Sequence, residues 1–134
     1  NAYYHFAKGE FGKALESVNR INFDILAFKY EIKNLQIMLL YELGETESLI
    51  YALDSYKHFA SNNKYVSEST RENIFRFIGY TGALCKLKDR PEKMKINMLK
   101  DKIDGDNLNT KYWLLEKTEE LLQLIVVAVK KVIS

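Results

Sequence analysis

Three side chains are of types that can act as nucleophile, proton carrier or metal ligand near neutral pH: His5, His58 and Cys85. Such chemistry needs several titratable groups close together, because burial and neighbouring charges must shift their pKa values. The two histidines fall in different predicted hairpins without a set of metal ligands around them. Cys85 falls on an apolar helical stripe, where a thiol behaves as a small hydrophobe. We therefore predict no catalytic residue, no metal site, no cofactor and a protein that is not an enzyme.

One segment carries a local excess of positive charge. Between Lys86 and Lys102 there are seven basic residues and three acids. A phosphate backbone would need such charges on one face. On a helix, however, Lys93 and Lys100 point one way while Lys95 and Lys102 point nearly opposite, and long lysine stems commonly border an apolar strip. We therefore expect these lysines to lie in solvent on either side of the apolar strip. The sequence does not favour nucleic acid as a partner.

The composition of the chain favours one helical domain. Its 134 residues fit a single domain, and one proline with six glycines among 47% apolar residues argues against a loop-rich β-sandwich and against disorder. A net charge of +2 produces no strong electrostatic attraction to an anionic surface. The apolar run from Leu121 to Val129 is shorter than the roughly 20 residues of a membrane span. We predict an all-α domain over residues 1–134 without such a span.

The ends of the sequence and its single cysteine give little information about the full-length protein or its compartment. The sequence has no initiator methionine and no signal-peptide pattern, so we expect a piece of a longer protein. Cys85 cannot form a disulfide within the chain, which is compatible with a reducing compartment and favours the cytoplasm over an oxidising one. The compartment itself is not readable from the sequence.

Residues 24–43 predict a helix that is apolar over most of its circumference. One stripe recurs at helical spacing, and a second set of apolar residues widens it: Ile25, Phe28, Ile32, Leu35 and Leu39, then Leu26, Tyr30, Ile37, Leu40 and Tyr41. Asp24 is the predicted N-cap, so a new helix is expected to begin there. A helix apolar on both sides belongs between neighbours, and we place it at the centre of the domain.

Further helices follow at short intervals. Gly44 ends the helix of residues 24–43, and another runs to about residue 60. Ser67 and Ser69 open the next helix, in which Gly79 and Gly82 predict close approach by a neighbour, because glycine is costly inside a helix. A helix then runs from the only proline, Pro91, to about residue 103, and a long last helix begins near Lys111.

The same turn pattern occurs more than once in the sequence. Gly9 is followed by Glu10, Gly44 is followed by Glu45, and Lys88 stands at the corresponding point of a third pair of helices. Intervals of 35 and 44 residues separate these three positions. Periods in this range indicate stacked helical hairpins, because one hairpin cannot bury its own apolar face.

The first unit, residues 1–22, resembles a tetratricopeptide repeat. The small residue, turn glycine, turn aromatic, alanine and bulky residue of that motif match Ala2, Gly9, Phe11, Ala14 and Val18. Later units depart from it: Thr46 replaces the turn aromatic, Leu49 the alanine and Lys88 the third glycine. The resemblance implies a tetratricopeptide-like α-α superhelix, a stack of antiparallel hairpins with about six helices plus a long C-terminal helix.

In that family the first helices of successive hairpins line a concave groove that accepts a peptide or a partner's helix. The corresponding positions here are Tyr3, Phe6, Glu31, Asn34, Met38, Tyr41, Phe75 and Ile78, with Gly82 and Cys85 beyond them. Glu31 and Asn34 are the most informative, because they are polar on an otherwise apolar helix. A simpler interpretation is that this pair meets solvent and the aromatics are core. The resemblance implies a non-enzymatic protein–protein interaction scaffold.

Two other functions stay open. The last helix could pack against its copy in a second chain and make the protein a self-association domain; the residues concerned are Trp113, Leu121, Ile125, Val126 and Val129. The lysine-rich segment from Lys86 to Lys102 could instead serve a nucleic-acid adaptor, whose affinity would fall steeply with salt.

Overall fold

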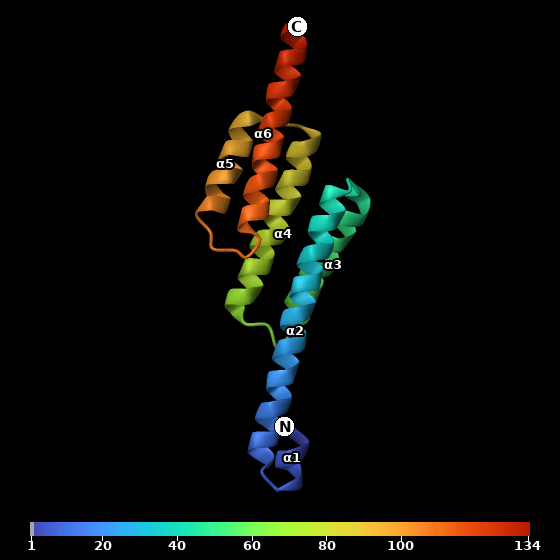
Figure 1. Cartoon of the computed structure of the whole chain (residues 1–134), viewed down its shortest axis with the longest axis vertical. Helices are drawn as coiled ribbons and strands as arrows, with labels where there is room; N and C mark the ends of the chain where they lie inside the picture. Colours follow the sequence, from blue (N-terminus) through green and yellow to red (C-terminus); the bar gives the residue numbers. More distant parts are fainter. Residues whose placement is uncertain (1) are drawn as a thin grey trace.

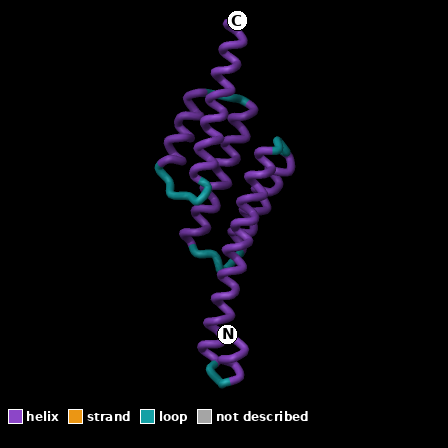
Figure 2. Tube along the Cα trace, viewed as in Figure 1, coloured by secondary structure: helices purple, strands orange, loops and turns teal. Residues whose placement is uncertain are grey.

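The chain folds entirely into helices and short connections (Figures 1 and 2). The structure is a computed structural model that describes residues 2–134, with the side chains of all of these except Tyr3 and Phe23. The helices are α1 (Ala2–Ala7), α2 (Phe11–Glu42), α3 (Thr46–Asn62), α4 (Glu68–Asp89), α5 (Lys93–Asp104) and α6 (Lys111–Ile133). The predicted all-α class is confirmed.

Two glycines reverse the chain through the same kind of turn. The backbone angle φ is 74° at Gly9 and 70° at Gly44, in the left-handed region that glycine adopts without a steric penalty. After each glycine, the amide of Glu10 or Glu45 donates a hydrogen bond to the carbonyl five residues back, at 2.8 and 3.0 Å. These bonds satisfy carbonyls at the helix end. The repeated glycine–acid pattern therefore marks two equivalent helix endings.

The helix break that we expected at Asp24 is absent. α2 runs without interruption from Phe11 to Glu42, and residues 13–42 contain no glycine or proline that would interrupt it. Inside a continuous helix the backbone amides after Asp24 are already bonded, so its carboxylate has no helix start to cap. Two expected helices are thus one, and the described chain has six helices including the C-terminal one.

Consecutive helices pack antiparallel, and α6 returns beside α4. Figure 1 shows α2 and α3 as one pair next to a second group of α4, α5 and α6. The core lies between these helices, and each of α2 to α6 contributes a fully buried side chain to it: Ile37, Tyr56, Leu84, Ile96 and Leu114. Burial of one such side chain stabilises the fold by about 1.5–3 kcal/mol.

The expectation that the helix of residues 24–43 lies at the centre of the domain, with apolar faces buried on both sides, is wrong. Ile37 and Tyr41 are buried in the core, but the opposite face of α2 is exposed along its length. We call this face the outer seam and define it by Val18, Ile21, Ile25, Phe28, Ile32, Leu35 and Leu39. The side chains of the outer seam are between 39% and 62% exposed. α2 therefore lies at the edge of the helical group, with one apolar face inward and one outward.

Details of α4 also differ from expectation. A Cβ atom added at Gly79 or Gly82 would meet no heavy atom within 4 Å, so neither glycine marks a close helix contact. The helix is capped by Ser67, whose Oγ accepts a hydrogen bond from the amide of Thr70 at 3.1 Å. Both Ser67 and Ser69 were predicted to open this helix, and Ser67 is the N-cap.

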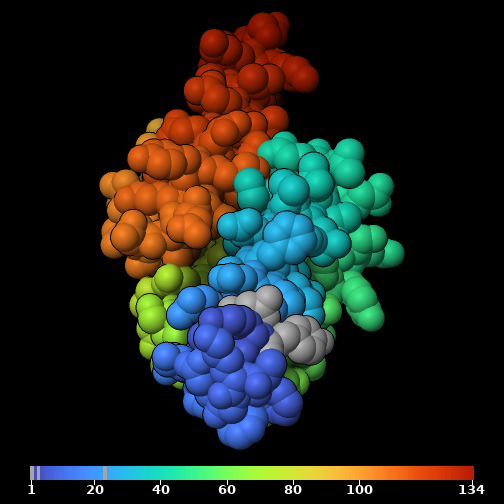
Figure 3. All heavy atoms as spheres, turned by 60° about the horizontal axis from the view of Figure 1, so that its bottom comes forward, coloured from blue at the N-terminus to red at the C-terminus, as the bar shows by residue number. Residues whose placement is uncertain are grey.

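Both ends of the molecule project from the body. The N-terminal arm, which we define as residues 2–25, contains α1 and the lower part of α2, and the last turns of α6 extend at the opposite end (Figure 1). Figure 3 shows the arm in blue, coming forward in front of the other helices. Among the described side chains of the arm, Ala14 alone is buried. No helix of the described residues is long and apolar enough to cross a membrane.

Candidate functional site

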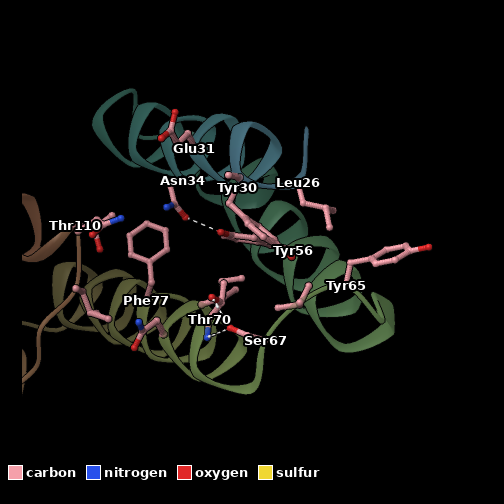
Figure 4. A pocket seen from close by; sticks show the side chains of 16 residues that line it. Leu26, Tyr30, Glu31, Asn34, Tyr56, Tyr65, Ser67, Thr70, Phe77 and Thr110 are labelled. Atoms are coloured by element: carbon pink, nitrogen blue, oxygen red, sulfur yellow. Dashed lines mark hydrogen bonds between the residues drawn. The ribbon is translucent and has the colours of Figure 1, made fainter. Parts of the chain in front are cut away.

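A cleft of about 350 Å³ opens between α2 and α4 (Figure 4). One wall is formed by α2, through Leu26, Ala27, Tyr30, Glu31 and Asn34, and the other by α4, through Thr70, Asn73, Ile74 and Phe77. Tyr56 of α3 lies between the walls, and residues 65–67 and 108–110 bound the cleft along its length. We call this space the α2–α4 cleft. Its volume is near the lower limit for ligand sites in proteins and suits one or two side chains of a partner.

Hydrogen-bonding groups lie among the aromatic rings of the cleft. The Tyr56 hydroxyl donates to Oδ1 of Asn34 at 2.8 Å, across the 22 residues that separate them in sequence. The Tyr30 hydroxyl oxygen is buried and has no hydrogen-bond partner among the described residues. The Tyr30 ring lies 6.4 Å from the Tyr56 ring and 5.6 Å from that of Phe59, measured between centroids. The cleft thus combines an apolar surface with a hydroxyl that has no hydrogen-bond partner among the described residues.

Burial raises the pKa of both phenols further above physiological pH. Desolvation raises the pKa of Tyr56 well above its ordinary value, and the neighbouring Tyr30 adds to the rise. Desolvation also raises the pKa of Tyr30, against a smaller lowering effect from the positive charge of Arg71. Both groups therefore remain able to donate a hydrogen bond, and neither has the lowered pKa of a general base or nucleophile near neutral pH.

Arg71 fixes the end of the cleft where α3 passes into α4. Its Nε donates to the carbonyl of Ala60 at 3.0 Å, and Nη2 donates to the carbonyl of Asn63 at 3.3 Å. Nη1 forms an ion pair with Glu68 at 2.7 Å. The guanidinium satisfies carbonyls at the end of α3 that the helix cannot pair itself. This connection therefore holds the two helices, and with them the cleft, in a fixed relation.

The structure separates the predicted groove residues into two groups. Glu31 and Asn34 line the α2–α4 cleft, and Figure 4 shows Asn34 turned toward Tyr56. Met38, Tyr41, Phe75 and Ile78 pack in or against the core and do not line the cleft. On α4 the neighbouring residues Ile74 and Phe77 line it instead, because one residue along a helix is a rotation of about 100°.

The remaining predicted positions lie elsewhere. Phe6 is exposed on the N-terminal arm, where its ring contacts that of Phe11 edge to face at 5.2 Å. The side chain of Tyr3 lies outside the described part of the structure. Cys85 packs against the core, and burial raises the pKa of its thiol, which opposes formation of the reactive thiolate.

A polar cluster that sequence analysis missed joins the end of α2 to α6. The side chain of Lys117 is almost completely buried, and Nζ is bonded to Glu42 of α2 and to Glu120 of α6, the latter at 2.8 Å. The Trp113 indole nitrogen donates to Glu42 at 3.0 Å, and its ring lies 5.4 Å from that of Tyr41. Glu42 and Lys117 are far apart in sequence, so no local spacing indicates the pair.

The charges of this cluster stabilise one another. The hydrogen bond from Lys117 lowers the pKa of Glu42, with a smaller contribution from the Trp113 hydrogen bond and an opposing one from burial. Burial lowers the pKa of Lys117, but its hydrogen bonds to Glu120 and Glu42 raise it by more, so the ammonium stays charged. The cluster joins α2 to α6 and fixes the partly buried Trp113 ring between the two helices.

Other candidates for chemistry stay apart from one another. His5 lies 3.6 Å from Glu10 on the N-terminal arm, whereas His58 is exposed on α3. Within residues 2–134, no group of three or more His, Cys, Asp or Glu side chains could hold a metal ion. Of the lysine-rich segment, Lys100 pairs with Glu119 of α6, while four basic residues line a hollow at α4 and α5 together with Asp89 and Glu92: Lys86, Arg90, Lys95 and Lys102. The basic residues are therefore divided between this hollow, where two acids lie among them, and the contact between α5 and α6.

The residues expected to mediate self-association are divided between core and surface. Leu121 is buried, and Trp113 and Ile125 pack against the core. Val126 and Val129 are exposed, with Val132 and Ile133 beyond them. Of the five residues, Val126 and Val129 in the last part of α6 are therefore open to a second chain.

Comparison with known proteins adds no relative. A scan against models of protein families finds no match, and searches of curated proteins and of solved structures find no similar chain. The resemblance of residues 1–22 to a tetratricopeptide repeat therefore stays a prediction, and the proposals that follow depend on the geometry of the chain itself.

Proposed function

We propose that this chain is a non-enzymatic protein-interaction module of the tetratricopeptide-like kind, which binds a peptide or a partner's helix in the α2–α4 cleft. One observation carries the proposal: two of the three helices that the repeat pattern designates as groove-lining, α2 and α4, are the walls of the cleft. Glu31 and Asn34, the predicted polar residues of α2, both line it.

The surface of the cleft suits insertion of an apolar or aromatic side chain. Leu26, Ile74 and Phe77 offer apolar contact, and burial of such an anchor is the usual source of affinity at an interface. The buried Tyr30 hydroxyl would donate a hydrogen bond to a backbone carbonyl or other acceptor of the ligand. A partner that supplies both an apolar anchor and an acceptor is favoured over one that supplies only the anchor.

A blocking substitution tests this function without weakening the core. Ala27 lines the cleft and is itself exposed, so Ala27→Trp would fill the space from its open side. Peptides would be selected on the wild-type protein from a random library, and their affinities measured by fluorescence anisotropy. We expect Ala27→Trp to weaken the selected peptides by at least about tenfold, equivalent to about 1.4 kcal/mol.

The matched control is Ser55→Trp, which places the same ring on an exposed position of α3 outside the cleft. This variant should bind the selected peptides as the wild type does. Equal affinity for the wild type and Ala27→Trp would reject the cleft as the binding site. Failure of the selection to yield any peptide would count against the function itself.

Self-association is a second candidate, favoured by the exposed apolar end of α6. Val126, Val129 and Val132 are exposed in the last part of α6, and the end of this helix extends beyond the other helices (Figure 1). In this alternative two chains bury these side chains against each other. Sedimentation at increasing concentration would show a dimer that Val129→Asp dissociates, whereas a monomer at all concentrations would exclude it.

A further inference from the structure

The outer seam of α2 is a second apolar surface, on a different face of α2 from the α2–α4 cleft, and Glu31 borders both. Its members alternate at intervals of three and four residues from Val18 to Leu39, which is the spacing of positions a and d in a heptad repeat. At 1.5 Å per residue the stripe is about 32 Å long. Scattered apolar side chains are common on protein surfaces, but a continuous stripe of this length marks an interaction site.

One helix already occupies the lower continuation of this seam. Ala14, the d position that precedes Val18, is buried at the place where α1 packs against α2. The ring contact between Phe6 and Phe11 belongs to the same helix pair. Because the turn at Gly9 reverses the chain, α1 runs antiparallel to α2. The seam therefore extends an established helix–helix contact beyond the end of α1.

Charges beside the seam distinguish possible occupants. Asp24 and Glu31 are at the g positions on one side, and Lys29 is at an e position on the other. These flanking positions set the partner and orientation of paired helices. An antiparallel second copy that overlaps the whole seam would place Lys29 beside its own equivalent and Asp24 beside Glu31. Both contacts bring like charges together, which opposes that pairing.

A parallel second copy is opposed by shape. Its α2 would have to follow the first α2 on the side of Ala14, where α1 already lies. A helix that runs along the seam antiparallel to α2 and ends above α1, in line with it, meets neither obstacle. Such a helix gains charge complementarity if it carries cations opposite Asp24 and Glu31 and an acid opposite Lys29.

We propose that the outer seam binds an amphipathic α-helix of another polypeptide, antiparallel to α2 and in line with α1, with basic residues facing Asp24 and Glu31 and an acidic residue facing Lys29. This site is additional to the α2–α4 cleft. Its occupant inserts aliphatic side chains between the exposed side chains of the seam, in the manner of a two-helix coiled coil.

Two synthetic helical peptides of about 21 residues, the length of the seam, test the proposal. Both carry leucine or isoleucine at a and d. The first has lysines on the flank that meets Asp24 and Glu31 and glutamates on the other flank, and the second has these charges exchanged. The first peptide should bind about tenfold more tightly than the second at low salt, and the ratio should shrink as salt screens the exposed charges.

Substitutions in the protein locate the binding and its charge dependence. Phe28→Asp on the seam should abolish binding of the first peptide, whereas Ile50→Asp, at an exposed position of α3, should leave it unchanged. The double variant Asp24→Lys, Lys29→Glu should reduce the tenfold preference to less than about threefold. Because these side chains are all exposed, circular dichroism should show the same helix content in every variant.

Several outcomes would overturn the proposal: binding of neither peptide, equal binding of both, or binding that Phe28→Asp leaves intact. A concentration-dependent dimer that Phe28→Asp dissociates would show that a second copy occupies the seam. Peptides selected for the α2–α4 cleft should bind Phe28→Asp as they bind the wild type, so failure at the seam is distinguishable from failure at the cleft.

Discussion

At the scale of residues, the ion pair between Glu42 and Lys117 makes stability depend on pH. The hydrogen bond from Lys117 lowers the pKa of Glu42 in the folded state relative to its ordinary value of 4.5. Its contribution to stability is therefore present above that value and is lost as the pH falls through the folded pKa. Since Glu42 is about half exposed, the contribution is less than about 1 kcal/mol.

Glu42→Gln removes this contribution but keeps an oxygen that can accept from Trp113. Its free energy of unfolding should therefore fall less between pH 7 and pH 3 than that of the wild type, as measured by urea denaturation at both values. Glu72→Gln, at an exposed position of α4, is the control and should show the wild-type pH dependence. A wild-type pH dependence in Glu42→Gln would mean that the pair contributes nothing.

Sequence analysis found part of the cleft at this scale. Glu31 and Asn34 are among the groove positions that the tetratricopeptide resemblance implies, and they were the most informative of these because they are polar on an apolar helix; both line the cleft. Tyr30 and Tyr56 were missed, since tyrosines on an apolar stripe are indistinguishable from core. The Lys117 cluster depends on a contact between α2 and α6, and no pattern within either helix could reveal it.

At the scale of elements, Asp24 and Ser67 give opposite expectations for an alanine substitution. Ser67→Ala removes a cap whose Oγ accepts from Thr70, and should lower the free energy of unfolding by about 1 kcal/mol. Asp24→Ala lies inside the continuous helix α2 and should raise it by up to about 0.5 kcal/mol, because alanine is the better helix former. If urea denaturation showed that Asp24→Ala lowers the free energy of unfolding by about 1 kcal/mol, this loss would indicate that a helix begins at Asp24 after all.

The glycines provide a second pair of contrasting substitutions. Gly79→Ala should raise the free energy of unfolding by about 0.5–1 kcal/mol, because the helix is retained and the added Cβ meets open space. Gly44→Ala should lower it, since the backbone there has a φ of 70° that alanine adopts only with strain. Thermal unfolding followed by circular dichroism measures both. Destabilisation by Gly79→Ala would indicate a close contact at α4.

The elements themselves were largely predictable. Gly9 and Gly44 identified their turns because few other residues adopt that backbone conformation. The continuity of α2 was not predictable, because Asp24 is a favourable N-cap only if the chain leaves the helix there. The stripe of residues 25–39 was placed in the core because apolar periodicity does not tell which of two apolar faces meets the rest of the chain.

At the scale of the whole molecule, stability should fall from the body toward the two projecting ends. The arm of residues 2–25 has a single buried described side chain, whereas α3 and α4 contribute several to the core. Regions with few buried contacts open locally at low cost. Hydrogen exchange of backbone amides should therefore be faster in residues 11–22 than in residues 49–60. Equal protection of both segments would mean that the arm is stabilised by contacts of its own.

The central claim is that the α2–α4 cleft receives a partner's side chain. The most direct measurement is the chemical-shift change of the isotope-labelled protein on titration with a peptide selected against it. We expect the largest changes at cleft residues, with Tyr30, Asn34 and Thr70 among them, and we expect Ala27→Trp to abolish these changes. Changes confined to the end of α6 or to the outer seam, with the cleft resonances unmoved, would contradict it.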